Sequence, residues 1–159
     1  LGKAHASWIV ECVKPFIDQH YRTSPQKETS FLAGSSLGGL MTAYTGATYP
    51  DVFGVLGIFS LASWVNDEAF LHYIAQHPLA TQTKVYLQVG TMEGNETDQG
   101  FTSKNVNQMY LDSSLWYYQT LLRTGQPIDT IWFRILADEI HHEKCWADHF
   151  GEFLVSSFQ

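Results

Sequence analysis

The segment 53–59 most constrains the fold, because apolar residues occupy both of its alternating faces. A strand of this kind must be covered on each side, as happens in parallel sheets with helices packed against them. Three further runs predict short strands, at 29–33, 84–89 and 130–136. The chain is therefore expected to build at least four parallel strands.

Helical patterns alternate with these strands along the chain. Helices are predicted at 5–21, 37–49, 67–76, 105–124 and 144–157, the first interrupted or tightened near Pro15. Because parallel neighbours need a crossover of about a dozen residues or more, this alternation indicates βαβ units. We predict an α/β fold, a three-layer α/β/α sandwich with a mostly parallel sheet, in one domain spanning residues 1–159.

Composition narrows the partners and the compartment. Hydrophobic residues make up 45% of the chain and charged residues 16%, which disfavours disorder. The net charge of -7 repels phosphate backbones and anionic membranes, so we expect neither nucleic acid nor a membrane as partner. Two cysteines, Cys12 and Cys145, are expected to be buried free thiols, which favours a reducing, cytoplasmic location.

One motif directly follows the predicted strand at 29–33, where the sequence reads Gly34-Ser35-Ser36-Leu37-Gly38. This is G-x-S-x-G between a strand and a helix, a nucleophile elbow whose sharp turn lifts the serine hydroxyl above the sheet edge. Gly34 and Gly38 are expected to let strand and helix approach. Ser36 is the predicted nucleophile, and the Leu37 N–H, at a helix N-terminus, is a predicted oxyanion donor.

A serine hydroxyl needs a base, and a neutral imidazole is the usual one. His141 and His142 both follow the fourth predicted strand, at the sheet edge where Ser36 is expected. The histidine in turn needs a carboxylate, and Glu93 follows the third strand. The order nucleophile, acid, base is the one that this architecture uses. Two other acids in the next loop are alternatives, Glu96 and Asp98.

Four stretches resemble the putative esterase family of α/β-hydrolases, which includes enterochelin esterase-like and feruloyl esterase-like enzymes: 31–40, 49–53, 89–93 and 141–146. Carried over by position, the resemblance implies Ser36 as nucleophile, Glu93 as acid and His141 as base, with His142 on a variable position. It implies a serine esterase that cleaves a small-molecule carboxylic ester through an acyl-enzyme. No cofactor and no metal are implied.

The resemblance covers only the C-terminal part of the family's domain. Several strands precede the family's elbow, and a loop after one of them gives a second oxyanion N–H, whereas only 35 residues precede Ser36 here. We expect a partial α/β-hydrolase fold lacking the N-terminal strands. The first strand then has an exposed edge, to which the missing half or a second copy of the chain would pair.

Other functions and sites stay open at this point. The same three residues would support acyl transfer, and a non-catalytic hydrolase-like binding module fits a chain with half an oxyanion hole. A helical spacing of i, i+4, i+8 for His141, Cys145 and His149 permits a metal site, but core packing is the simpler interpretation. Three residues are candidates for the substrate pocket: Ser35, Trp64 and His142.

Overall fold

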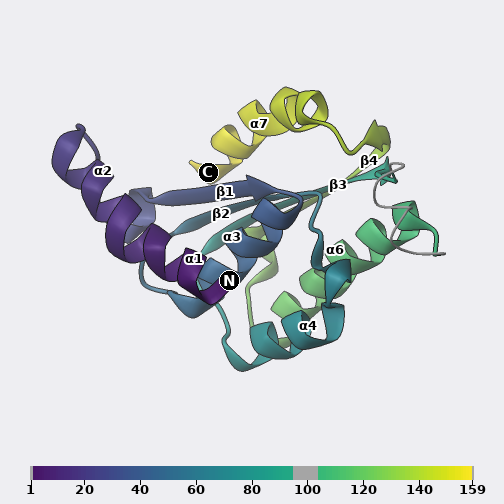
Figure 1. Ribbon diagram of the computed structural model, residues 1–159, viewed down its shortest axis with the longest axis horizontal. Helices are drawn as coiled ribbons and strands as arrows, with labels where there is room; N and C mark the ends of the chain where they lie inside the picture. Colours follow the sequence, from purple (N-terminus) through teal and green to yellow (C-terminus); the bar gives the residue numbers. More distant parts are fainter. Residues whose placement is uncertain (1, 95–103, 159) are drawn as a thin grey trace.

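A parallel sheet organises the computed structural model, which describes residues 2–94 and 104–158 (Figure 1). The described strands are β1 (Phe31–Ser35), β2 (Val55–Phe59), β3 (Lys84–Met92) and β4 (Ile131–Ile140). They lie in the order β1-β2-β3-β4, and every neighbouring pair is parallel. The predicted α/β class is confirmed.

Helices cover both faces of this sheet, as predicted. Three crossover helices lie on one side: α3 (Leu37–Thr48), α4 (Asp67–Gln76) and α6 (Val106–Arg123). On the opposite side lies α7 (Glu143–Ser157) (Figure 1). Short 3-10 turns precede β1, α4 and β4: η2 (Lys27–Thr29), η3 (Ser63–Val65) and η4 (Ile128–Thr130).

The strand β2 lies at the centre of the core, and all five of its residues are buried. The larger apolar cluster includes Leu56, Ile58 and residues of α3, α4 and α6. A smaller cluster under α7 contains Phe59 and Phe153. A Cβ at Gly57 would lie 2.8 Å from the Phe153 ring, so the glycine lets α7 approach β2 closely. The carboxyl end of β2 is thereby held from both sides.

The N-terminal helical segment differs from the prediction in one respect. It consists of α1 (Gly2–Trp8), a π-helical stretch η1 (Ile9–Val13) and α2 (Lys14–His20). The interruption near Pro15 is confirmed, but the expected tightening is wrong, because the Lys14 N–H donates to the Ile9 carbonyl five residues earlier. Proline lacks an N–H and crowds the preceding turn, and one wider turn accommodates it.

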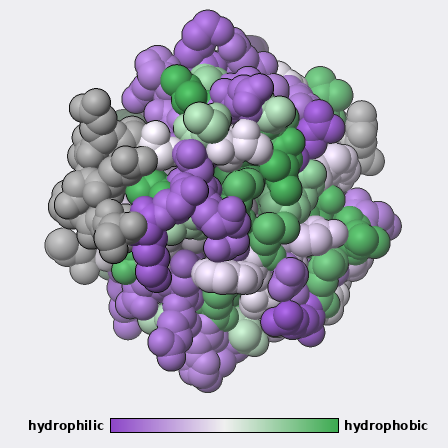
Figure 2. All heavy atoms as spheres, turned by 90° about the vertical axis from the view of Figure 1, so that its right-hand side faces the viewer, coloured by the Kyte–Doolittle hydropathy of each residue, from purple (hydrophilic) through white to green (hydrophobic). Residues whose placement is uncertain are grey.

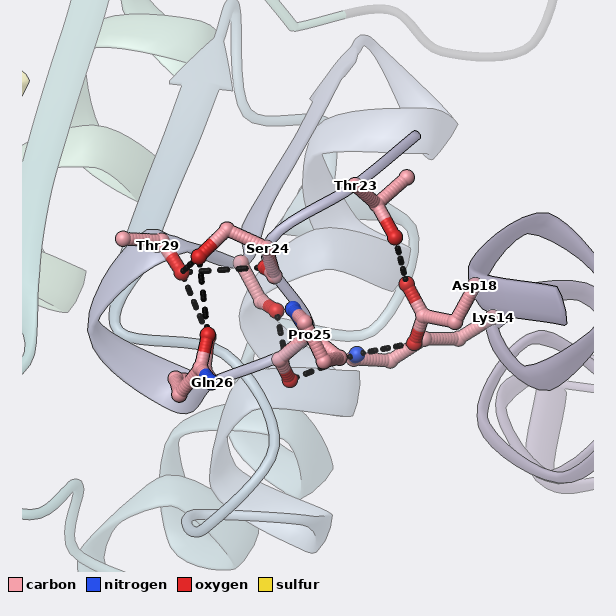
Figure 3. Close-up of polar contacts among 8 residues, drawn as sticks. Lys14, Asp18, Thr23, Ser24, Pro25, Gln26 and Thr29 are labelled. Carbon is pink, nitrogen blue, oxygen red and sulfur yellow. Dashed lines mark hydrogen bonds and ion pairs between the residues drawn. The ribbon is translucent and has the colours of Figure 1, made fainter. Parts of the chain in front are cut away.

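A group of polar contacts fixes the loop between α2 and β1 (Figure 3). Lys14 Nζ donates to Asp18 Oδ2 at 2.7 Å and to the Pro25 carbonyl at 3.0 Å. The Thr23 hydroxyl donates to Asp18 Oδ1 at 2.8 Å. Hydrogen bonds from Lys14 and Thr23 hold the pKa of the Asp18 carboxyl below its ordinary value. The chain therefore enters β1 along a defined path.

The strand β1 lies at one edge of the sheet, and no described strand pairs with its outer side. Its residues are half-buried or exposed, unlike those of β2. An apolar groove of about 390 Å³ runs beside β1 toward α7, lined by Ala33, Trp146 and Phe150 among others. A second groove of about 340 Å³ lies toward α3 and includes Leu32 and Met41. The edge thus presents both backbone groups and apolar surface.

Neither cysteine is buried, so that prediction is wrong. Cys12 is exposed on η1, and Cys145 is partly exposed on α7, both as free thiols. The Cys145 thiol forms a hydrogen bond with Glu139 of β4 near the surface, which raises the pKa of the thiol. Within 2–94 and 104–158, the helices are too short or too polar to cross a membrane.

Candidate active site

The chain makes a sharp turn at Ser36, between β1 and α3, where the sequence predicts the elbow. Its backbone lies at φ 58° and ψ -124°, a region that residues other than glycine rarely adopt. The Ser36 N–H donates to the Phe59 carbonyl at 2.9 Å, and its own carbonyl accepts from the Ala62 N–H at 3.3 Å. The strained turn is therefore held by the end of the buried strand β2.

Two glycines permit this turn, but they are not both the predicted ones. A Cβ at Gly34 would lie 2.4 Å from the Gly38 carbonyl oxygen, so Gly34 is required, as expected. A Cβ at Gly38 would meet no atom within 4 Å, whereas one at Gly39 would lie 3.1 Å from the Phe59 carbonyl. The prediction for Gly38 is wrong, because the residue that faces β2 is the next one along α3.

Glu93, which is buried, and His141, which is partly exposed, form a pair after β3 and β4. Glu93 is 1% exposed, and its Oε2 lies 2.7 Å from His141 Nδ1. Its Oε1 accepts from the Ser60 hydroxyl at 2.6 Å and from the Gly90 N–H at 2.7 Å. A buried carboxylate is tolerated only where donors surround it. Ser60 and Gly90 supply two such donors to Oε1, and His141 Nδ1 lies within hydrogen-bond distance of Oε2.

This pairing determines how His141 is protonated. Because a carboxylate accepts, Nδ1 carries the hydrogen, and in the neutral ring Nε2 is left with its lone pair. The ring lies between Tyr110, with centroids 4.8 Å apart, and the edge-on indole of Trp146 at 5.0 Å. Packing and the carboxylate together fix an imidazole in the tautomer that a general base requires.

Ser36 and His141 are not joined by a hydrogen bond. Among residues 2–94 and 104–158, the Ser36 hydroxyl has no hydrogen-bond partner. The two residues are nevertheless connected through one strand end, because Phe59 holds the elbow and Ser60 holds Glu93. Catalytic hydrogen bonds are often long without substrate and shorten in the reacting complex.

Leu37 is the first residue of α3, and the side chain of the N-cap residue Ser36 forms no capping hydrogen bond with this helix. The N–H groups of a first helical turn have no intrahelical partner and lie at the positive end of the helix dipole. The Leu37 N–H thus directly follows the Ser36 turn at a helix N-terminus, and its role as an oxyanion donor stays a prediction.

The three predicted pocket residues have different surroundings. Ser35, the last residue of β1, lines the groove that includes Trp146. Trp64, on η3, packs edge-on against Tyr110 with centroids 5.8 Å apart. The His142 side chain is 58% exposed and accepts from the Lys144 N–H at 3.1 Å, so it caps α7. Of these three residues, only Ser35 and Trp64 lie near residues whose rings contact His141, namely Trp146 and Tyr110.

The three residues considered for a metal site have separate partners. His141 is engaged by Glu93, whereas Cys145 and His149 both interact with Glu139. Hydrogen bonds from Cys145 and His149 lower the pKa of the Glu139 carboxyl. No group of three metal-ligating side chains occurs in the part of the chain that the structure describes. The alternative acids lie outside the described residues: Glu96 and Asp98.

Two residues that contact this site carried no predicted role there. Ser60 directly follows β2, and the rule that functional groups gather at the carboxyl ends of parallel strands indicates its position. Trp146 lies in the 141–146 motif, and its Nε1–H donates to the Ser60 hydroxyl at 2.8 Å. Figure 2 shows the face toward which the strands run, with hydrophobic side chains near its centre and hydrophilic ones around them.

The parallel sheet, the serine on a strained strand-to-helix turn and the acid–histidine pair after later strands define an α/β-hydrolase type of protein. The sequence profile of the family described as "Putative esterase" matches residues 3–119. The chain belongs to this family.

Comparison with known proteins supports the fold. The uncharacterized protein YbbA of Bacillus subtilis (strain 168) is 24% identical over 150 residues, which are 94% of this chain and 57% of that protein. The enterobactin esterase FES of Shigella flexneri superposes with a TM-score of 0.75 at 19% identity, covering 95% of this chain and 37% of that one. A ferulic acid esterase of Anaeromyces mucronatus superposes with a TM-score of 0.69 at 17% identity, covering 97% of this chain and 55% of that one. The chain spans little more than half of its curated relative.

Proposed function

We propose that this chain carries the nucleophile, base and acid of a serine esterase, with Ser36, His141 and Glu93 in these roles. The observation that carries the proposal is the 2.7 Å hydrogen bond between His141 and the buried Glu93, together with a serine on a strained turn at the carboxyl end of a strand of the same parallel sheet. Membership of an esterase family and the esterase activity named for two structural neighbours support the same chemistry.

The proposed reaction proceeds through an acyl-enzyme. Ser36 Oγ attacks the ester carbonyl while His141 Nε2 takes its proton, and the C–O bond to the alcohol then breaks as His141 returns that proton to the leaving group. Glu93 holds the ring and stabilises its charged form. The Leu37 N–H donates to the oxyanion. Water, activated by the same histidine, then releases the acid.

A fluorophosphonate probe tests this proposal on the full-length protein. The probe is expected to modify Ser36, as mapped by mass spectrometry, and Ser36→Ala should abolish the labelling. His141→Ala should slow it by at least about 1000-fold, since the hydroxyl loses its base. Matched controls change residues away from the site: Ser114→Ala on α6 and His77→Asn after α4.

The outcomes separate the candidate functions. A folded protein that leaves Ser36 unlabelled contradicts catalysis and favours the non-catalytic binding module. With a chromogenic acetate ester and an added alcohol, acetic acid as the main product supports hydrolysis, whereas the new ester supports acyl transfer.

We also propose that another strand pairs along the outer edge of β1. Unpaired backbone groups flanked by apolar grooves recruit strands. The greater length of the relatives favours the remainder of a longer chain as the source of that strand. A natural protein heavier than 18.0 kDa whose β1 amides resist hydrogen exchange supports this, whereas a dimer of 18.0 kDa chains assigns the edge to a second copy. A monomer of that mass contradicts both.

We propose a cytoplasmic location on the ground that Cys12 and Cys145 are free and accessible thiols, which oxidising compartments disfavour. Cell fractionation of the tagged full-length protein tests it, and recovery in an exported fraction would contradict it.

A further inference from the structure

Ser60 lies at a junction between the sheet, the acid and the last helix. It is 1% exposed, and its backbone is held at φ 51° directly after β2. Its N–H donates to the Gln88 carbonyl of β3 at 2.8 Å. Its side chain touches both Glu93 and Trp146, which come from distant parts of the chain. A buried serine at this positive φ calls for an explanation, because residues other than glycine rarely adopt that conformation.

Hydrogen-bond chemistry fixes the direction of these two contacts. An indole N–H can only donate, so Ser60 Oγ accepts from Trp146 Nε1 at 2.8 Å. The single hydrogen of the Ser60 hydroxyl is then free for Glu93 Oε1, 2.6 Å away. A chain of donors therefore runs from Trp146 through Ser60 to the carboxylate. Each bond in such a chain polarises the next.

We propose that Ser60, oriented by Trp146, is a positioning residue that holds Glu93 in the conformation that pairs with His141. With Oε1 held by Ser60 and Gly90, Oε2 is left to face His141 Nδ1. Trp146 contributes twice, because its ring also packs edge-on against His141. The inference rests on the proposed esterase function, but the geometry that it concerns can be measured without turnover.

Two substitutions separate positioning from stability. Ser60→Ala and Ser60→Gly both remove the hydroxyl, but only glycine relieves the positive φ. Glycine should therefore be the more stable variant. Both should lower kcat by about 10- to 100-fold with KM changed less than about 2-fold, as expected for a lost hydrogen bond to a charged group. If kcat instead parallels stability across the two variants, with Ser60→Gly nearly as active as wild type, the proposal is overturned.

A second pair of variants tests the link to Trp146. Trp146→Phe keeps an aromatic ring beside His141 but removes the donor to Ser60. It should lower kcat less than Ser60→Ala does, and it should add little in the Ser60→Ala background, because the donor chain is already broken. Independent, multiplying losses would contradict a shared chain. Ser114→Ala serves as control, since this buried hydroxyl has no hydrogen-bond partner within the described part of the chain.

Proton NMR distinguishes failure of this inference from failure of the esterase proposal. In the wild-type protein the His141 Nδ1–H should give a resonance far downfield of the amide region that is protected from exchange. Ser60→Ala should shift it upfield and speed its exchange, and Ser114→Ala should not. An unchanged resonance in Ser60→Ala refutes the positioning role whether or not the protein hydrolyses esters. A shifted resonance in a protein that never labels at Ser36 refutes the esterase and leaves the positioning geometry standing.

Discussion

The strain at the elbow predicts that two inactivating substitutions of Ser36 differ in stability. Ser36→Ala and Ser36→Gly both remove the hydroxyl, which has no hydrogen-bond partner among the described residues. Alanine keeps a Cβ at φ 58°, whereas glycine adopts that conformation without steric cost. We expect Ser36→Ala to unfold within about 0.5 kcal/mol of wild type, and Ser36→Gly to be the more stable variant.

The size of the difference follows from two opposing contributions. A residue held in such a conformation stores about 1–3 kcal/mol of strain. Glycine loses more backbone entropy on folding, which offsets about 0.5–1 kcal/mol of the gain. Ser36→Gly should therefore exceed Ser36→Ala by about 0.5–2 kcal/mol in free energy of unfolding. For a chain of this length that corresponds to about 1 to 8 °C in Tm.

Urea unfolding of both variants measures the difference, and calorimetry gives the Tm. The matched control is the same pair of substitutions at Ser114, within α6, where φ is not positive. There glycine should be less stable than alanine by about 1 kcal/mol. The sign of the difference must reverse between the two positions. If Ser36→Gly is the less stable variant at position 36 as well, the elbow is not strained and the reasoning fails.

Three further outcomes are expected. Gly34→Ala should lower the free energy of unfolding, measured with urea, by about 1–3 kcal/mol, because the added Cβ meets the Gly38 carbonyl. Gly38→Ala should be neutral or stabilising, since a Cβ there meets no atom. Equal effects of the two substitutions would contradict the elbow geometry. Glu93→Gln should lower kcat by about 1000-fold or more, and near-normal turnover would exclude it as the acid. The folded-state pKa of Glu139 is lowered, chiefly by Cys145, so its stabilisation is fully present above the ordinary value of about 4.3 and is lost as pH falls below that value through the lowered folded-state pKa. The difference from Glu139→Gln at pH 6 should therefore vanish in strong acid.

Hydrophobic patterning predicted the elements well where both faces of a segment are buried. The strand at 53–59 was recognised because β2 is covered on both sides. The fourth strand was predicted at 130–136, but β4 extends to Ile140. Its later part contains Asp138 and Glu139, which interrupt the apolar pattern. Asp138 is exposed at this sheet edge and Glu139 contacts polar groups of α7, while the strand still pairs with β3 as far as Ile140, so pairing and not hydrophobicity sets the end of the strand.

The candidate site was predictable to the level of strand ends but not of contacts. Ser36, Glu93 and His141 each follow a strand, and parallel strands bring such positions to one edge. The bond from Trp146 to Ser60 joins residues 86 positions apart, and it depends on the approach of α7 that Gly57 permits. Similarly, Gly39 and not Gly38 faces β2 because of where the helix begins. Such contacts follow from packing, for which local sequence carries no signal.

Backbone strain in this protein is concentrated where side chains must be aimed. In the part of the chain that the structure describes, three residues other than glycine have positive φ: Ser36, Ser60 and Asp138. The first two follow β1 and β2, and the third precedes His141 by three residues, with its N–H bonded to the Thr91 hydroxyl at 2.8 Å. Strain of this kind persists only where surrounding structure over-determines it. The fully buried β2 supplies that constraint, since its last carbonyl holds the elbow and the residue after it holds the acid. Burial of β2 in the core thus fixes the positions of the Ser36 turn and of Glu93.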